Sequence, residues 1–331
     1  MPTFEEVHRL YRERLDKSDP DSARAFYEIM VARFILIAAS LPFAIGSLLA
    51  AYRTGRFNWP VFLLGSVVVF LINAAVNAGN TYFDYETDLQ NQDFSAYSGG
   101  IRILVEGKIT NRHHALYFAL ALLALAGPLG LAIYFFLHTG PWTIVLGLIG
   151  AFCGWFYTSP PLKLVYRGLG ELVIAGCSGI LTVVSGYYLQ AGAFNLAMVP
   201  PAGALAAAIL NVILINEFAD RPSDARSGKK TWLVRLGPER AAMVYQVNQI
   251  VSLLFLLSGP LFGLPWYVAW GAAALAFPVA WRNRREIRAG AWAGDGINDL
   301  TLNTFGAHLL LELGLAVGLL VALALRYFHI A

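Results

Sequence analysis

The chain has 331 residues, of which 57% are hydrophobic and 14% are charged, and its mean hydropathy is +0.58. Soluble proteins carry about 25% charged residues, so this composition excludes an ordinary soluble enzyme and predicts a protein that crosses a membrane repeatedly. The net charge of +3 gives no indication of nucleic-acid binding.

Apolar runs of roughly 20 residues are long enough to cross a bilayer as helices. These runs predict an all-α fold, a polytopic membrane bundle of about nine transmembrane helices that forms a single domain over residues 1–331. The predicted helices lie near 29–51, 60–83, 114–137, 141–157, 170–190, 198–219, 241–261, 264–281 and 300–326. Residues 1–25 are too polar for a cleavable signal peptide, and we expect an amphipathic segment on the membrane surface or a flexible tail.

Lysine and arginine are concentrated in the N-terminal segment and in alternate loops, which are 84–113, 158–169, 220–240 and 282–299. Positively charged loops stay on the cytoplasmic side of a membrane. The pattern therefore predicts a multi-pass protein of the plasma (inner) membrane, with its N-terminus in the cytoplasm and its C-terminus outside. The long polar loops then form a cytoplasmic cap, and a site built from them faces cytoplasmic substrates.

The first polar motif follows the apolar run 60–83 and contains Asn77, Asn80, Asp84 and Asp88. If the helix continues, the last three of these residues fall four positions apart and line one face. Two carboxylates at a bilayer edge are costly unless a cation meets them, and Mg²⁺ is commonly held by carboxylates together with phosphate oxygens. The alternative interpretation is a solvated helix end that merely carries acids.

Candidate phosphate-binding groups lie on either side of this motif. Residues 98–100, Ser-Gly-Gly, allow a tight turn with exposed backbone amides, and Arg102 follows closely. Tyr157 and Lys163 flank a double proline, which ends a predicted helix and stiffens the link after it. Arg33 lies inside the first predicted helix, where an arginine must reach the interface or bind an anion.

The second polar motif contains Asn216, Asp220, Asp224 and Lys229. It repeats an acidic pair at a spacing of four near the end of a predicted helix, and cations follow it. Pro222 lies inside the pair, so we expect an irregular helix here, with the two carboxylates converging around a kink.

Two acidic pairs with interleaved lysine and arginine predict a diphosphate held through Mg²⁺. If the diphosphate leaves from an allylic carbon, surrounding aromatic rings stabilise the cation that remains. A membrane setting suits a substrate with a long hydrocarbon tail. The rival class is a cation-coupled membrane transporter, but its acids should lie near the middle of broken helices rather than at helix ends.

The motifs resemble those of a known family. Asn80-x₃-Asp84-x₃-Asp88 and Asp220-x₃-Asp224-x₃-Gly228 are similar to the two Asp-rich motifs of the UbiA superfamily of intramembrane prenyltransferases. Tyr157-Thr-Ser-Pro-Pro-Leu-Lys163 and Tyr166-Arg-Gly-Leu-Gly-Glu171 resemble its linking segment. The resemblance implies Mg²⁺-dependent transfer of a prenyl group from a polyprenyl diphosphate to an acceptor, usually an aromatic one.

By this resemblance, the catalytic residues, which are also the metal ligands, are Asp84, Asp88, Asp220 and Asp224. The residues that contribute to substrate binding are Arg33, Asn77, Asn80, Arg102, Tyr157, Lys163, Asn216 and Lys229. The implied partners are the polyprenyl diphosphate, the aromatic acceptor and membrane lipids.

Within the superfamily, 77–84 and 98–110 look most like the branch that acts on 1,4-dihydroxy-2-naphthoate in menaquinone biosynthesis. The spacing of Asp88 and the position of Pro222 depart from that branch and leave the acceptor open. The alternatives are another phenol, an ether-lipid precursor, or an internal double bond, which would make the protein a terpene cyclase. Neither the length of the prenyl chain nor the oligomeric state follows from the sequence.

Overall fold

The computed structural model describes residues 23–30, 39–91, 101–294 and 296–328. Within these ranges the regular structure is helical and contains no strand, so the predicted all-α class is confirmed. Arg33, the 98–100 turn and most of the predicted N-terminal segment lie outside the described residues.

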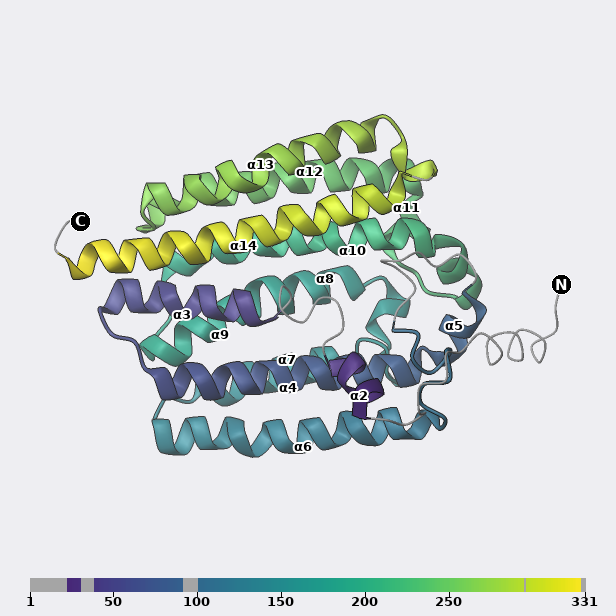
Figure 1. Ribbon diagram of the computed structural model, residues 1–331, viewed down its shortest axis with the longest axis horizontal. Helices are drawn as coiled ribbons and strands as arrows, with labels where there is room; N and C mark the ends of the chain where they lie inside the picture. Colours follow the sequence, from purple (N-terminus) through teal and green to yellow (C-terminus); the bar gives the residue numbers. More distant parts are fainter. Residues whose placement is uncertain (1–22, 31–38, 92–100, 295, 329–331) are drawn as a thin grey trace.

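The long helices lie side by side in one bundle (Figure 1). The short helices α5 and α11 lie at one end of the bundle, and the last turn of α14 lies at the opposite end. The helices are α2 (Ala23–Met30), α3 (Leu41–Thr54), α4 (Trp59–Phe83), α5 (Tyr85–Gln90), α6 (Arg112–Leu137), α7 (Trp142–Trp155), α8 (Gly170–Ile174), the π-helical η3 (Ala175–Leu181), α9 (Thr182–Ala191), α10 (Val199–Ser227), α11 (Trp232–Leu236), α12 (Pro238–Leu257), α13 (Trp266–Arg288) and α14 (Ile297–Tyr327).

Among the described residues, six helical stretches are long and apolar enough to cross a membrane. They are Trp59–Phe83, Arg112–Leu137, Gly170–Ala191, Leu196–Ser227, Pro238–Leu257 and Ile297–Tyr327. The apolar helix α7 has only 14 residues, a length of about 21 Å against a hydrocarbon core of about 30 Å. A multi-helix membrane bundle is therefore confirmed, whereas the predicted count of nine spans is not.

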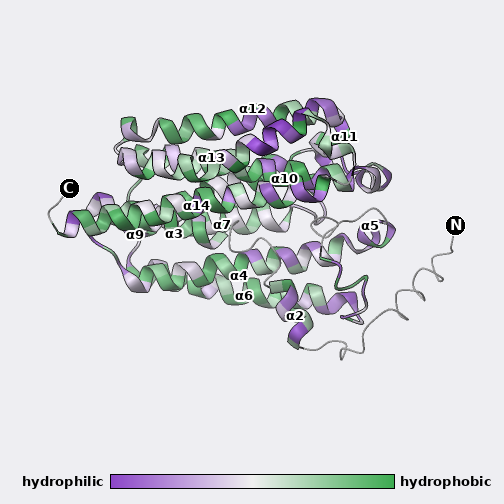
Figure 2. Cartoon of the chain, turned by 45° about the horizontal axis from the view of Figure 1, so that its top comes forward, coloured by the Kyte–Doolittle hydropathy of each residue, from purple (hydrophilic) through white to green (hydrophobic). Residues whose placement is uncertain are grey.

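Large apolar side chains are exposed along the lengths of the helices, as at Phe136, Leu148 and Leu254. Hydrophilic residues gather mainly at the end of the bundle where α5 and α11 lie (Figure 2). An apolar surface of this extent needs an apolar environment around it. The polar end of the bundle is therefore the part suited to the membrane edge.

The residues of the first polar motif stay one helical turn apart, although the helix is interrupted at Asp84. α4 begins after Asn58, whose side chain accepts a hydrogen bond from the backbone of Val61, and ends at Phe83. Asp84 leaves the helical conformation, yet its N–H still donates to the carbonyl of Asn80 over 2.8 Å, and the N–H of Asp88 donates to Asp84 over 2.8 Å. The predicted spacing of Asn80, Asp84 and Asp88 by one turn each is confirmed.

The irregular helix predicted at Pro222 is not found, and the helix does not end at residue 219 as predicted. α10 runs without interruption to Ser227 and stops at Gly228, which has a φ of 77°. Pro222 is exposed, and burial of most of the helix stabilises it against the hydrogen bond that proline cannot donate. Asp220 and Asp224 consequently lie one turn apart on a continuous helix.

Two glycines bring α3 and α9 into backbone contact. A Cβ on Gly46 would lie 2.0 Å from the carbonyl oxygen of Val183, and one on Gly186 would lie 2.1 Å from that of Phe43. The hydroxyl of Ser47 donates across this contact to the carbonyl of Gly186 over 3.2 Å. Small residues at such crossings let membrane helices pack closely, so no larger side chain fits here.

Candidate active site

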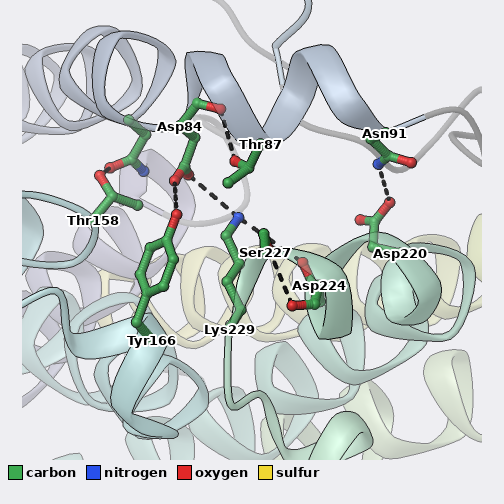
Figure 3. Close-up of polar contacts among 10 residues, drawn as sticks. Asp84, Thr87, Asn91, Thr158, Tyr166, Asp220, Asp224, Ser227 and Lys229 are labelled. Atoms are coloured by element: carbon green, nitrogen blue, oxygen red, sulfur yellow. Dashed lines mark hydrogen bonds and ion pairs between the residues drawn. The ribbon is translucent and has the colours of Figure 1, made fainter.

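The acids of the two polar motifs face each other at the end of the bundle that carries α5 and α11. Asp84 ends α4, and Asp220 and Asp224 come from the last turns of α10. Lys229 reaches between the two sides, as Figure 3 shows. Its Nζ lies 3.6 Å from the Oδ2 of Asp84 and 3.9 Å from the Oδ1 of Asp224. One cation therefore bridges carboxylates from opposite halves of the chain.

A second bridge joins Asn91, at the end of α5, to Asp220, which lies one turn before Asp224 on α10. The Nδ2 of Asn91 donates to the Oδ1 of Asp220 over 3.1 Å. Arg102 stabilises this arrangement, because its Nη1 donates to the carbonyl of Asp88 over 3.0 Å and to that of Asn91 over 3.4 Å. In this structure the buried side chain of Arg102 thus holds the backbone that carries the acids.

The buried acids at this end of the bundle favour the binding of cations between them. Burial, reinforced by the nearby Asp84 carboxylate, raises the pKa of Asp88 well above its usual range. Burial alone would lower the pKa of Lys229, but Asp84 and Asp224 outweigh it, so the pKa is raised and the side chain remains a cation. Acids this close together are stable as anions only when cations stand between them.

Tyr166 contacts the other oxygen of Asp84. Its hydroxyl group donates to the Oδ1 of Asp84 over 3.3 Å, and the ammonium groups of Lys163 and Lys229 lie 5.1 Å and 5.6 Å from its ring centroid. Burial, together with the charge of Asp84, raises the pKa of Tyr166 to about 12. The phenol therefore stays protonated and acts as a donor.

Backbone hydrogen bonds join the beginning of the segment between α7 and α8 to its later residues. The N–H of Leu164 donates to Phe156 over 3.0 Å and that of Val165 donates to Tyr157 over 3.0 Å. The hydroxyl of Thr158 then donates to the Oδ1 of Asn80 over 2.8 Å, which fixes that amide beside the acids. Burial and the nearby Glu217 raise the pKa of Tyr157 well above its usual value, so this phenol is neutral.

An apolar cavity of about 250 Å³ begins beside Asn80 and Tyr157 and follows α4 as far as Gly65. Over this distance α4 rises about 22 Å. The opposite walls are formed by α6, α7, η3 and α9, through Gly130, Ile133, Leu146, Gly147, Gly150, Cys177, Leu181, Ser185 and Leu189. Gly147 leaves the cavity open, since a Cβ placed on it would meet no atom within 4 Å.

The donor set fits a hard divalent cation only in part. Across the ranges that the structure describes, no group of three or more His, Cys, Asp or Glu side chains is close enough to hold one ion. The bridging position of the Lys229 ammonium nevertheless shows that positive charge is accommodated between the acids. Mg²⁺ is commonly bound by one or two carboxylates, with phosphate oxygens and water completing its shell. The residues therefore fit Mg²⁺ when phosphate oxygens and water supply its remaining ligands.

The structure brings most of the predicted residues together and leaves a few apart. Those gathered at the acidic end or along the cavity are Asn77, Asn80, Asp84, Asp88, Arg102, Tyr157, Asp220, Asp224 and Lys229. Lys163 is exposed and touches the site only through the ring of Tyr166. Asn216 lies one turn before Asp220, and its Oδ1 is buried with no hydrogen-bond partner among the described residues.

Sequence reasoning assigned no role to Asn91, Thr158 or Tyr166, although each one hydrogen-bonds a predicted site residue. Tyr166 lies within a segment that resembles the family, so its position was a usable signal. Thr158 lies within the other such segment, 157–163, and carried the same signal, whereas Asn91 carries none in the sequence.

The sequence matches the UbiA prenyltransferase family over residues 39–294, which is most of the chain. The protein belongs to this family. It is 32% identical over 254 residues to the 1,4-dihydroxy-2-naphthoate octaprenyltransferase of Mycobacterium tuberculosis, covering 76% of this chain and 82% of the relative. It is 27% identical over 266 residues to the 2-carboxy-1,4-naphthoquinone phytyltransferase of Synechocystis sp., covering 78% and 83%.

A solved structure has the same fold. The UbiA homologue of Archaeoglobus fulgidus, bound to GPP and Mg²⁺, superposes with a TM-score of 0.67 at 17% identity, covering 90% of this chain and 99% of that one. Family membership makes this UbiA-family chain a prenyltransferase and an integral membrane protein.

Proposed function

We propose that this UbiA-family prenyltransferase transfers a prenyl group from a polyprenyl diphosphate to an aromatic acceptor, 1,4-dihydroxy-2-naphthoate, in menaquinone biosynthesis. One observation carries the proposal. Asp84, one of the facing acids bridged by Lys229, lies one helical turn beyond Asn80, which lines the end of the apolar cavity. A charged headgroup and a long apolar tail therefore find complementary surroundings side by side.

The four aspartates are the groups that hold Mg²⁺ in this proposal, with Asp84 and Asp88 on one side and Asp220 and Asp224 on the other. Bound Mg²⁺ stabilises the negative charge on a departing diphosphate. Lys229 contributes a fixed positive charge beside the same oxygens, and Tyr166 orients Asp84 by its hydrogen bond. The structures of the Archaeoglobus relative with GPP or DMAPP and Mg²⁺ support this assignment.

The tail of the donor lies along α4 in the cavity, which places the reacting carbon near Asn80 and Tyr157. The bond between that carbon and the diphosphate oxygen breaks, and the oxygen keeps the electron pair. The phenol ring of Tyr157 stabilises the allylic cation through its face, since the group is neutral and buried. The aromatic acceptor then forms the new bond to the prenyl carbon and releases a proton.

Two lines of support favour the naphthoate acceptor. The relatives from Mycobacterium tuberculosis and Synechocystis sp. are both named for naphthalene-type acceptors. The motif residues 77–84 resemble the same branch of the family. The distribution of lysine and arginine further supports a plasma-membrane location with the acidic end in the cytoplasm.

The decisive experiment presents purified protein in liposomes with prenyl diphosphates of several lengths and a panel of acceptors, with Mg²⁺ or with excess chelator. We expect prenylated 1,4-dihydroxy-2-naphthoate in the presence of Mg²⁺ and none with chelator. Preferential use of another phenol or of a glycerol phosphate would show the acceptor to be wrong. Formation of a cyclic hydrocarbon and diphosphate from the donor without any acceptor would instead identify a cyclase.

A further inference from the structure

Two further acids are buried near the site but belong to neither aspartate pair. Glu171, in the first turn of α8, is 1% exposed, and Glu217, on α10, is 5% exposed. Their carboxyl groups accept hydrogen bonds from two successive backbone amides, those of Trp232 and Leu233, so the two acids lie at one place. Burying acids in a membrane protein is costly unless donors satisfy them, so their partners indicate what they do.

The donors are the first backbone amides of α11. The N–H of Trp232 donates to the Oε1 of Glu171, and the N–H of Leu233 donates to the Oε2 of Glu217 over 3.2 Å. The third amide, that of Val234, donates to the side chain of Thr231 over 3.4 Å. The first amides of a helix have no partner within it, so this carboxyl pair and the cap complete the start of α11.

The start of α11 is also hydrogen-bonded to the segment between α7 and α8. The indole N–H of Trp232 donates to the carbonyl of Gly168 over 3.3 Å. Gly168 has a φ of 74°, and a Cβ on it would lie 2.8 Å from the carbonyl oxygen of Lys230. Tyr166 and Lys229 therefore stand on two loops that are packed and hydrogen-bonded together.

We propose that Glu171 and Glu217 are positioning residues that act as a carboxyl clamp. The clamp fixes the start of α11. It thereby fixes the positions of the Nζ of Lys229 and the hydroxyl of Tyr166 relative to Asp84. Lys229 lies three residues before Trp232, so a shift of the clamped amides moves its backbone directly. A displacement of about 1 Å in such a group is enough to weaken binding or catalysis severely. The consequence for substrate binding rests on the proposed function.

Hydrogen exchange tests the clamp without any substrate. Glu217→Leu removes the acceptor of the Leu233 amide, whereas Glu217→Gln keeps a carbonyl oxygen for it. We expect the amides of Trp232 and Leu233 to exchange about tenfold faster or more in Glu217→Leu and at the parent rate in Glu217→Gln. Glu286→Leu, on α13, is the matched control and should leave both amides unchanged. Unchanged exchange in Glu217→Leu would overturn the proposal.

If Glu217→Leu does not fold, Glu217→Ser replaces it, because serine is too short to reach the amide yet remains polar. The same acceleration is expected, and parent-like protection in Glu217→Ser would overturn the clamp. These outcomes do not depend on prenyl transfer. A parent protein that transfers no prenyl group to any acceptor would remove the proposed function and leave the exchange result standing.

Kinetics then separate positioning from simple structural support. We expect Glu217→Leu to raise the KM for the prenyl diphosphate about tenfold, with kcat at saturating donor and the KM for the acceptor within about twofold of the parent, and Glu217→Gln to restore the donor KM. Binding of inorganic pyrophosphate with Mg²⁺, followed by thermal shift, should weaken in parallel. A lower kcat and thermal midpoint with an unchanged donor KM would show a purely structural role and refute positioning.

Discussion

The hydroxyl group of Tyr166 donates a hydrogen bond to the Oδ1 of Asp84, while the opposite oxygen of that carboxylate faces Lys229. Three separate segments thus meet at one side chain: the end of α4, the link between α7 and α8, and the loop after α10. Changes at this junction give the sharpest tests of the proposed chemistry.

Replacing the carboxylate of Asp84 should abolish turnover but preserve the fold. Asp84→Asn keeps the size and one acceptor oxygen, and it removes the negative charge that Mg²⁺ requires. We expect kcat to fall about 100-fold or more, measured as the rate of product formation at saturating donor and acceptor. Asp299→Asn, at an exposed position in the first turn of α14, is the control and should be active. Full activity in Asp84→Asn would refute the metal assignment.

Removing the hydroxyl of Tyr166 should have a smaller effect. Tyr166→Phe keeps the ring beneath the two lysines and deletes only the donor to Asp84. A single hydrogen bond contributes about 0.5–1.5 kcal/mol, so kcat/KM should fall about threefold to tenfold. Steady-state kinetics across a Mg²⁺ titration provide the measurement. A loss as large as that of Asp84→Asn would mean that the phenol takes part in the reaction itself.

Lys229 should be needed mainly for donor binding. Lys229→Met keeps the length of the side chain and removes its charge, and interactions with charged groups contribute enough for a roughly tenfold to hundredfold rise in donor KM. Lys229→Arg should recover part of the affinity. The neighbouring Lys230 is exposed and forms no ion pair with the acids among the residues that the structure describes, so Lys230→Met serves as the control. Equal effects at the two lysines would show that only general charge matters.

Filling the cavity should change the length of donor that is accepted. Gly147→Leu places a branched side chain into open space beside α4 and should slow long-chain donors much more than short ones. The ratio of kcat/KM between a long and a short prenyl diphosphate is the measurement. Gly271→Leu on α13, where the glycine also has no neighbour within 4 Å, lies away from the cavity and should leave the ratio unchanged. An unchanged ratio in Gly147→Leu would place the tail elsewhere.

The parts of the site that follow a local period were predictable from sequence. Asn80, Asp84 and Asp88 recur at four-residue intervals, and a helical backbone turns that interval into a common face. Pro222 misled the prediction because its local preference is weaker than the burial that keeps α10 helical as far as Ser227. Propensity is only a prior, which tertiary packing overrides.

Contacts between distant segments were not predictable in this way. Asn91 and Asp220, or Glu171 and Trp232, are paired by the packing of helices that are far apart in the chain. No spacing rule connects such residues, so their roles emerged only from the fold. The predicted roles of the four aspartates as metal ligands and of Lys163 in diphosphate binding stay predictions.

The backbone contact between Gly46 and Gly186 has a consequence remote from the acids. Phe43 on α3 and Ser185 and Leu189 on α9 line the inner end of the cavity, and their separation is set by the two helices that these glycines hold in contact. A slightly larger residue at this crossing would separate the two helices and change the shape of the inner end of the apolar cavity. Under the proposed function, the length of prenyl chain that the cavity accepts therefore depends on a helix crossing that lies away from the reacting groups.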